Sequence, residues 1–461
     1  MKAYNKFAML AALVFAVARF APATPLDDYV AAPDDNYRYS VAETITGPAY
    51  TAYVLNMTSQ SWRSKSEVDR TLWQHWLTVV KPDKVASNKA LLWITGGSNR
   101  DSAPTSVDSI VANIATHTKT VVAELRMVPN QPLVFPDGGR PRSEDGIIAY
   151  TFDKYVTTGD PNWPLLLPMV KSAVRAMDTI HDCMVSVSRG QLKINEFVVS
   201  GASKRGWTTW LTAAVDPRVI AIAPVVIDVL NMDKQMKHHY GAYGFYSSAI
   251  HDYEDMKIFE RLDTPQGRAL RKFVDPHEYR SRYTMPKFMI NGSGDQFFLP
   301  DAAQFYFHDL PGEKYLRYVP NTDHGLGGSD AERSLLIFYQ SILTGAPRPK
   351  FSWQIKDNRI IVRSISGKLI EVNQWQASNP KARDFRLETI GKVWQSSSIT
   401  PQSPATYIAQ VQEPARGWTA FFVELVYDTP PAFLRKQEGG AIPYKFTTQV
   451  HVVPNLLPFA K

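Results

Sequence analysis

The sequence predicts a two-part α/β protein, in which a mostly parallel sheet covered by helices precedes a smaller antiparallel β region. Three observations support this fold class. Short apolar runs alternate with helical patterns from about residue 89 to 320, as in sheets whose two faces are both covered. From about residue 350 the strands become short and alternating, which is typical of antiparallel pairing. At 461 residues, the chain also exceeds what one core usually supports.

Continuous apolar runs are the strongest strand signals in the chain. Such runs are typical of strands that are buried on both faces of a parallel sheet. They occupy residues 90–94, 120–125, 197–200, 219–227, 287–291 and 313–319. Apolar residues at helical spacing predict helices between them, at 106–115 and 165–180. Further upstream, the spacing of Trp73, Trp76 and Leu77 fits either an amphipathic helix or a half-exposed strand.

We predict three segments in the chain. Residues 1–23 are a signal peptide, 24–347 form an α/β domain, and 348–461 form an antiparallel β-sandwich, with the boundary in the Gly- and Pro-containing stretch 345–349. Within the α/β domain, an insertion at about 228–285 is rich in Tyr, Phe, Met and His. Insertions at the carboxyl end of a parallel sheet commonly build a cap or a pocket. The alternative is a packed helical excursion without substrate contact.

The N-terminus has the pattern of a secretory signal peptide. A basic start precedes a short apolar run over residues 7–18, and Ala21-Pro22-Ala23 is the predicted cleavage site. The run is too short for a membrane span, although Arg19 and the proline depart from the pattern and leave an uncleaved anchor as an alternative. No later stretch is long and apolar enough to cross a membrane. We therefore expect a secreted or periplasmic protein without stable membrane insertion after cleavage.

Composition and charge place the chain among folded globular proteins. Hydrophobic residues make up 44% of it and charged residues 21%, values that are unlike those of disordered chains. The net charge of +7 is modest for this length, and basic residues are interspersed with acids, so we expect no nucleic acid partner. Cys183 is the only cysteine, which excludes an intrachain disulfide. We interpret it as a buried structural thiol near a helix end rather than a nucleophile.

Residues 197–214 have the strand–turn–helix pattern of a nucleophile elbow. A run of β-branched and aromatic residues leads to Ser203 in a turn of small residues, and an apolar helical segment follows. Such a turn holds a serine in a strained backbone conformation at the end of a parallel strand. Gly201 and Gly206 would let strand and helix approach closely. The usual motif has glycine two residues after the serine, where this chain has Arg205.

Two later loops supply an acid and a base for this serine. Asp295 follows a predicted strand in a glycine-rich turn, and His324 lies in a glycine-rich loop after the next strand. The order serine, aspartate, histidine is that of α/β-hydrolase sheets, so we predict a triad of Ser203, His324 and Asp295. Asp228 is a rival for the acid, and Asp323 is interpreted as a loop cap. Each residue alone fits an ordinary turn or helix cap, and their joint order at strand ends favours the triad.

Backbone amides near the serine are the predicted oxyanion hole. The amide of Lys204 is one donor. The loop after the first predicted parallel strand offers Gly97 and Ser98, with Gly96 as a further option. Glycines in that loop would serve a tight turn equally well. We therefore expect Lys204 to act together with one amide from this glycine-containing loop.

Four residues are assigned to substrate binding. The aromatic side chains of Tyr240 and Tyr243 in the insertion, together with Trp207 beside the elbow, are expected to shape an apolar or aromatic acyl site. Arg205 has two alternative roles. It binds a substrate carboxylate, or it pairs with a buried acid and holds the turn.

No metal and no cofactor are predicted. His238 and His239 are adjacent, so their side chains diverge in a helix or a strand, and no zinc-hydrolase signature accompanies them. Neither a phosphate-binding loop nor a dinucleotide fingerprint occurs in the sequence. The chemistry is therefore expected to depend on side chains and backbone amides alone.

Several segments carry the pattern of one known family. They are residues 93–97, 200–210, 217–228, 291–298, 323–325, 375–386 and 417–422. On these segments the chain resembles the PhoPQ-activated pathogenicity-related protein family, whose relatives include the autocrine proliferation repressor proteins of amoebae. The resemblance covers nearly all of the mature chain and implies an exported α/β-hydrolase-type protein with an appended β-domain. It also implies that the elbow around Arg205 is the family's own form of the motif, and it implies no particular substrate.

The residues favour a secreted serine hydrolase that cleaves an ester or amide bond in a small molecule or a peptide. A peptidase of the prolyl-oligopeptidase kind has less support, because no propeller-like repeat precedes the α/β domain. The family resemblance implies an association with virulence or host interaction. The alternative is a non-catalytic secreted signalling or adhesion protein on a hydrolase scaffold, which would bind a protein partner through its β-domain.

Overall fold

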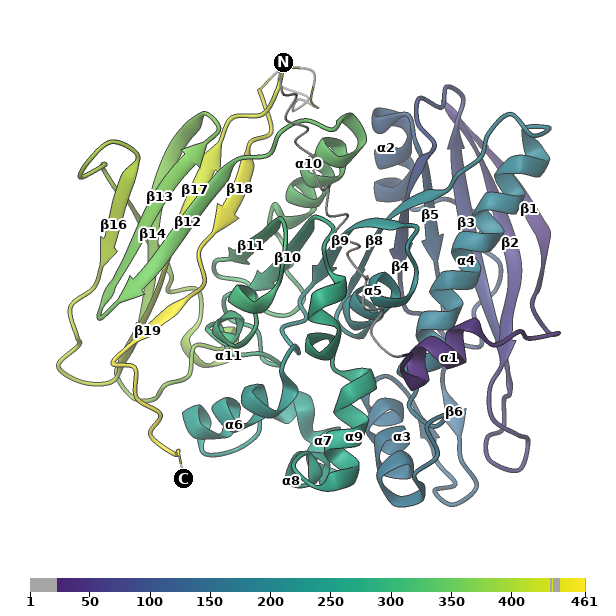
Figure 1. Cartoon of the computed structure of the whole chain (residues 1–461), viewed down its shortest axis with the longest axis horizontal. Helices are drawn as coiled ribbons and strands as arrows, with labels where there is room; N and C mark the ends of the chain where they lie inside the picture. The colour runs from purple at the N-terminus through teal and green to yellow at the C-terminus, as the bar shows by residue number, and fades with distance from the viewer. Residues whose placement is uncertain (1–22, 432, 434–439, 461) are drawn as a thin grey trace, which may run out of the picture.

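A large sheet crosses the molecule and has helices on both faces (Figure 1). The computed structural model describes residues 23–431, 433 and 440–460. The predicted signal peptide therefore lies outside the described residues, except for Ala23. Among the helices of the described ranges, none has both the length and the apolar character needed to span a bilayer.

Six consecutive parallel strands form the centre of the large sheet. In spatial order they are β5 (Val121–Leu125), β4 (Lys89–Ile94), β8 (Glu196–Ala202), β9 (Val219–Val225), β10 (Lys287–Gly292) and β11 (Lys314–Val319). All six coincide with the continuous apolar runs of the sequence, so the predicted parallel sheet is confirmed. The carboxyl ends of these strands bring the loops after β4, β8 and β10 to one edge.

Helices cover both faces of this parallel sheet. One face carries α1 (Pro25–Ala31), α4 (Leu166–Val187) and α5 (Lys204–Val215), and the other carries α2 (Ser109–Thr118) and α10 (Ala331–Thr344) (Figure 1). Along β4, Leu92 belongs to the core on the α4 and α5 side, whereas Leu91 belongs to the core on the α2 and α10 side. This alternation explains why the central strands are apolar at nearly every position. Cys183 lies buried in α4, and burial raises the pKa of its thiol to about 11.

Three antiparallel strands extend the sheet beyond β5. They are β1 (Arg38–Gly47), β2 (Tyr50–Ser61) and β3 (Leu72–Pro82). The segment that the sequence left open between helix and strand is therefore a strand. Trp73 and Leu77 are buried on one side of β3 while Trp76, one position out of phase, is half-buried, as the two-residue period of a strand requires.

Short helices between β9 and β10 form the predicted helical cap. They are α6 (Met232–Tyr243), α7 (His251–Asp255), α8 (Ile258–Arg261) and α9 (Pro265–Val274), with 3₁₀ turns at Ser248–Ile250 and Pro276–Arg282. They gather with α3 (Asp145–Thr158) at one end of the molecule (Figure 1). The hairpin β6 (Leu133–Val134) and β7 (Pro141–Arg142) precedes α3. Two further 3₁₀ turns, Ala302–Phe305 and Phe307–Asp309, lie between β10 and β11.

The C-terminal part consists of antiparallel strands in two groups. One group is the small sheet of β12 (Lys350–Lys356), β13 (Arg359–Ser366) and β16 (Thr406–Gln410). The other comprises β14 (Leu369–Asn379), β15 (Gln395–Ser398), β17 (Trp418–Tyr427), β18 (Tyr444–Thr447) and β19 (His451–Val453), with helix α11 (Leu387–Ile390) between β14 and β15. The predicted antiparallel character is confirmed.

The central sheet continues into this C-terminal part. β18 pairs antiparallel with β11, Leu316 opposite Thr447, and the strand order runs on through β17, β14 and β15. The small sheet packs against it, and Phe351 of β12 lies 5.8 Å from Phe446 of β18 between ring centroids. One layer of the predicted sandwich is therefore hydrogen-bonded to the α/β sheet.

Candidate active site

Ser203 occupies the turn between β8 and α5 in a strained backbone conformation. Its φ is 58° and its ψ is −127°, a region that costs a residue with a side chain about 1–3 kcal/mol. The Ser203 amide donates to the carbonyl of Val225 at 2.8 Å and fixes the turn to β9. A Cβ added at Gly201 would lie 2.8 Å from the carbonyl oxygen of Arg205, and one at Gly206 would lie 2.6 Å from a methyl of Ile227. Close approach of strand and helix thus depends on glycines at 201 and 206.

Asp295 and His324 form a hydrogen-bonded pair. The His324 Nδ1 lies 2.7 Å from Oδ2 of Asp295, which is buried. The other oxygen, Oδ1, accepts the amides of Phe297 at 2.7 Å and Phe298 at 3.3 Å. With Nδ1–H donating to the carboxylate, neutral His324 presents Nε2 as a proton acceptor. That Nε2 has no hydrogen-bond partner among the described residues.

The two rival acids of the sequence have other partners. Asp228 is buried and accepts hydrogen bonds from the hydroxyls of Tyr306 and, at 2.8 Å, Tyr318. Burial raises the pKa of Asp228 to about 6, against those hydrogen bonds and with a further push from the charge of Asp295. Asp323 accepts the amide of Gly325 at 2.8 Å, which is the loop-capping contact expected of it. His324 is therefore paired with Asp295.

A narrow apolar cavity of about 50 Å³ opens at Ser203. The cap supplies Met232, Met236, Ile250, Tyr253 and Phe259 to its walls, and the loop after β10 supplies Phe297 and Phe298. The Phe297 ring also packs against His324, with 4.2 Å between centroids and a tilt of 36° between the rings. Ser203 and His324 thus flank the same aromatic pair, and the cap contributes to the walls beside the serine.

The four residues assigned to substrate binding lie in different surroundings. Trp207 lines the cavity at Ser203, and its indole donates to the carbonyl of Val274 at 2.6 Å. Tyr240 packs against Tyr246, with 5.5 Å between ring centroids, and Tyr243 packs against His239 at 4.8 Å. Both tyrosines lie away from the walls of this cavity. Sequence reasoning instead missed Phe297 and Phe298, although they lie only two and three residues after Asp295.

Two backbone amides are available to an oxyanion. Lys204 is the first residue of α5, so its amide has no partner within the helix. The amide of Ser98 donates to Oδ2 of Asp101 at 2.9 Å, which argues against its use as an oxyanion donor. Gly97 has a φ of 144°, and a Cβ there would lie 2.8 Å from the same carboxylate oxygen. The glycine is thus required by the fold of this loop, and its amide remains a candidate oxyanion donor beside that of Lys204.

A charged network from α3 supports the elbow. The Arg205 guanidinium donates to both carboxylate oxygens of Glu144, at 2.7 and 2.8 Å, and to the carbonyl of Val128. The Lys204 ammonium lies 2.8 Å from Glu144 and 3.0 Å from Asp145. Although burial alone would raise it, the hydrogen bonds and charges of Arg205 and Lys204 lower the pKa of Glu144 to about 2. Arg205 therefore pairs with an acid, the second of its two predicted roles.

Glu144 has the same unusual backbone conformation as Ser203. Its φ is 54° and its ψ is −129°, at the residue that precedes α3. Its amide donates to Oε1 of Gln131 at 2.8 Å, while the Gln131 side chain donates to the carbonyl of Gly97 at 3.0 Å. The network thus links the elbow to the oxyanion loop. No local sequence pattern identified Glu144.

Residues of the C-terminal part contact both loops of the acid–base pair. The amide of Leu387 donates to the carbonyl of Gly294 at 2.9 Å, next to Asp295. The Asn321 side chain donates to the carbonyl of Trp394 and accepts its amide, both at 2.9 Å. A Cβ on Gly294 would lie 2.8 Å from the Leu387 nitrogen, so glycine is required for this contact.

The two adjacent histidines of the cap point to different partners. His238 Nε2 lies 3.0 Å from both carboxylate oxygens of Asp301, and His239 Nε2 accepts the amide of Ser247 at 3.0 Å. Asp301 also pairs with Arg383 at 2.7 Å. Within the described ranges, no group of three or more His, Cys, Asp or Glu side chains is arranged to hold a metal ion.

The fold and these loops define an α/β-hydrolase-type protein with a cap and additional C-terminal strands. Residues 26–386 match the PhoPQ-activated pathogenicity-related protein family, and the chain belongs to this family. It is 38% identical to autocrine proliferation repressor protein A of Dictyostelium discoideum over 460 residues, which cover 95% of this chain and 92% of that protein.

Solved structures with a similar chain path include two acetyl xylan esterases. The enzyme from a Thermoanaerobacterium species has a TM-score of 0.48 and 14% identity, and that from a Paenibacillus species has a TM-score of 0.49 and 15% identity. Each comparison covers 69% of this chain and 91% of the esterase.

Proposed function

We propose that this protein is an exported serine hydrolase that cleaves an ester or amide bond. The observation that carries the proposal is the Asp295–His324 pair, whose Nε2 has no described partner, together with a strained elbow serine whose cavity is lined by the two phenylalanines that contact His324. Ser203 Oγ attacks the carbonyl carbon while His324 Nε2 takes the hydroxyl proton. His324 then protonates the leaving group, and water hydrolyses the acyl-enzyme by the same route. The amides of Lys204 and Gly97 stabilise the oxyanion.

A short acyl group fits the proposed site best. The apolar cavity at Ser203 measures about 50 Å³, and one water needs roughly 10–15 Å³ by this measure. The cavity therefore accommodates an acyl group of a few heavy atoms unless the cap moves. The side chains of Met232 and Met236, which are flexible, form part of the wall that would limit longer chains.

A fluorophosphonate probe and the Ser203→Ala variant test the proposal. Wild type should become labelled, and the variant should not, because the probe bonds covalently to an activated serine. In a companion assay, acetyl esters should be cleaved faster than octanoyl esters, and aminopeptidase substrates serve as the comparison. Absence of labelling in folded wild-type protein, or equal labelling of Ser203→Ala, would rule the mechanism out.

The second candidate function is non-catalytic signalling. It is favoured by the name of the 38% identical relative, a proliferation repressor protein. In this case the C-terminal strands would bind a protein partner, and the site residues would have only a structural role. A biological effect retained in full by Ser203→Ala would favour signalling over hydrolysis.

A further inference from the structure

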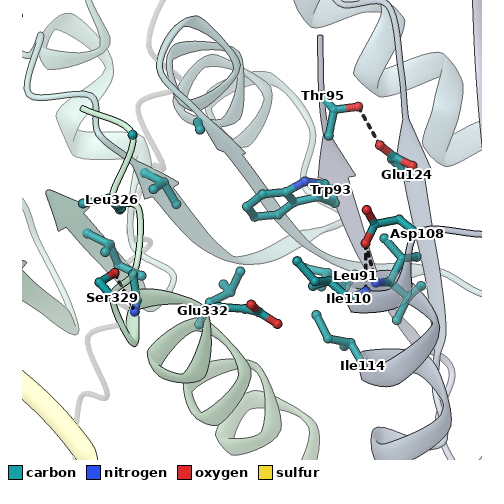
Figure 2. Close-up of a pocket in the computed structure, with 18 of the residues that line it drawn as sticks. Leu91, Trp93, Thr95, Asp108, Ile110, Ile114, Glu124, Leu326, Ser329 and Glu332 are labelled. Atoms are coloured by element: carbon teal, nitrogen blue, oxygen red, sulfur yellow. Dashed lines mark hydrogen bonds between the residues drawn. The ribbon is translucent and has the colours of Figure 1, made fainter. Parts of the chain in front are cut away.

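A second, larger pocket lies on the face of the sheet covered by α2 and α10. Its volume is about 460 Å³, within the range of roughly 300–1,000 Å³ typical of small-molecule sites. The strand residues Leu91, Val122 and Ile290 line it. Ile114 of α2 and Leu326 also line it and lie on opposite sides of the view in Figure 2. This α2–α10 pocket is separate from the cavity at Ser203, which lies beneath the cap.

Three carboxylates line this apolar pocket. They are Asp108 before α2, Glu124 on β5 and Glu332 on α10. None of the described side chains around the pocket is basic, and none of the three acids forms an ion pair within the described ranges. The chain as a whole carries a net charge of +7. Asp108 caps α2 by accepting the amides of Ile110 and Val111, while the carboxylates of Glu124 and Glu332 have no basic side chain among the residues that line the pocket, which favours a cationic occupant.

Glu124 is the most unusual of these acids. It lies on an interior strand whose other residues are buried, directly opposite Trp93 on β4. One oxygen accepts the hydroxyl of Thr95 at 3.0 Å. Burial raises the pKa of Glu124, against that hydrogen bond and the charge of Arg126. A half-buried carboxylate with a single hydrogen bond is costly when it has no ion pair, and a cation in the pocket would supply that ion pair.

Trp93 adds an aromatic surface for the same ligand. In Figure 2 its indole projects into the middle of the pocket, with Leu326 on one side and Asp108 and Glu124 on the other. Glu332 extends its carboxylate toward this space from α10. Indole faces attract organic cations, most strongly when the cation has lost its water. The pocket combines apolar walls, an indole ring and carboxylates. This combination suits a ligand that carries an ammonium group on an apolar body.

We propose that the α2–α10 pocket binds an organic cation, specifically an aryl- or alkylammonium compound. The apolar body packs between Ile114 and Leu326, and the ammonium group lies near Trp93 and the carboxylates of Glu124 and Glu332. The site is independent of the serine chemistry proposed above. The pocket adjoins the proposed catalytic residues only at its edge. Ala202 and Gly325 line it, and they are next to Ser203 and His324 in sequence.

Calorimetric titration of the full-length protein with benzyltrimethylammonium tests this proposal. Benzyl alcohol and benzenesulfonate serve as neutral and anionic comparisons. The ammonium compound should bind at least tenfold more tightly than either, because only it carries a positive charge for the carboxylates of Glu124 and Glu332. Glu124→Gln and Glu332→Gln should each weaken its binding about fivefold. Glu43→Gln removes the same charge from an exposed position on β1 and should leave binding unchanged.

Three outcomes would overturn the proposal. They are no binding of the ammonium compound at millimolar concentration, equal binding of benzyl alcohol, and equal weakening by all three Glu→Gln variants. Glu332 is on the exposed first turn of α10, so Glu332→Gln keeps the test decisive should Glu124→Gln not fold. Because binding rather than turnover is measured, failure of the hydrolase proposal would leave the result interpretable.

Discussion

The nucleophile side and the acid–base side of the candidate site are supported in different ways. Around Ser203, ionic groups contact the elbow itself, as Glu144 binds Arg205 and Lys204. Around Asp295 and His324, the direct contacts are neutral hydrogen bonds that Leu387 and Trp394 contribute. Two buried ion pairs on that side, Arg383 with Asp301 and Arg386 with Asp384, lie outside the loops that carry Asp295 and His324.

This difference has an energetic consequence. The neutral contacts are spread over backbone groups, so each single side chain contributes about 1 kcal/mol. Both cations of the elbow pair with Glu144, and loss of that carboxylate leaves nearly buried Arg205 without its charged partner while Lys204 keeps Asp145, which costs more than one hydrogen bond. Substitution of Glu144, or acid, should therefore lower the free energy of unfolding through the elbow. On the acid–base side, the loss from any one supporting side chain should be small and independent of pH.

The largest expected effect concerns the orientation of the base. Asp295→Asn should lower kcat by about 10⁴-fold with little change in stability, because an amide can donate to Nδ1 and favour the tautomer with Nε2 protonated. The amide oxygen can still accept the amide of Phe297, so the loop is kept. Steady-state kinetics with an acetyl ester measure the effect. Asp228→Asn is the matched control and should lose less than about tenfold; a larger loss than in Asp295→Asn would reverse the assignment of the acid.

Next in size is the effect of removing the shared carboxylate. Glu144→Gln should destabilise the protein by about 2 kcal/mol, below the range for fully buried pairs because the Glu144 side chain is 39% exposed. Chemical denaturation measures the change. The matched control, Asp263→Asn, breaks an exposed pair with Lys237 and should cost less than about 0.5 kcal/mol. Equal losses in the two variants would contradict the special role of Glu144.

Acid should abolish the difference in the free energy of unfolding between wild type and Glu144→Gln. The pKa of Glu144 is lowered from 4.5 to about 2, so the stabilisation is fully present above pH 4.5 and is lost as the pH falls through about 2. The stabilities of the two proteins should therefore converge between these values. Denaturation curves at pH 7, 4 and 2.5 test this, and a difference that stays constant would show that the charge of Glu144 is irrelevant.

The two sides also differ in how far the sequence predicts them. The order Ser203, Asp295, His324 could be predicted because each residue follows an apolar strand within a short turn, and both signals are local. The support of the elbow could not, because Glu144 meets Arg205 across 61 positions of sequence. The same limit applies to β18, whose pairing with β11 joins Thr447 to Leu316. Non-local contacts have no periodic pattern that a single sequence displays.

Aromatic residues of the cap illustrate a second limit. In the sequence, Tyr240 and Tyr243 cannot be distinguished from Tyr253 and Phe259, because all four are aromatic residues of the cap. In the structure, only Tyr253 and Phe259 of these four line the cavity at Ser203. The cap consists of short helices joined by turns, so the direction of each side chain depends on how the helices pack. Helical periodicity over so few residues does not settle which face points to the serine.

The smallest expected effect is on the neutral side of the comparison. Asn321 has a φ of 58°, so Asn321→Gly keeps the backbone conformation while removing both side-chain bonds to Trp394. The loss should be about 1 kcal/mol, and it should be the same at pH 7 and pH 4 because no ionisable group takes part. Denaturation at the two pH values measures it. A loss that exceeds that of Glu144→Gln, or that vanishes in acid, would mean that the two sides of the site are supported in the same way.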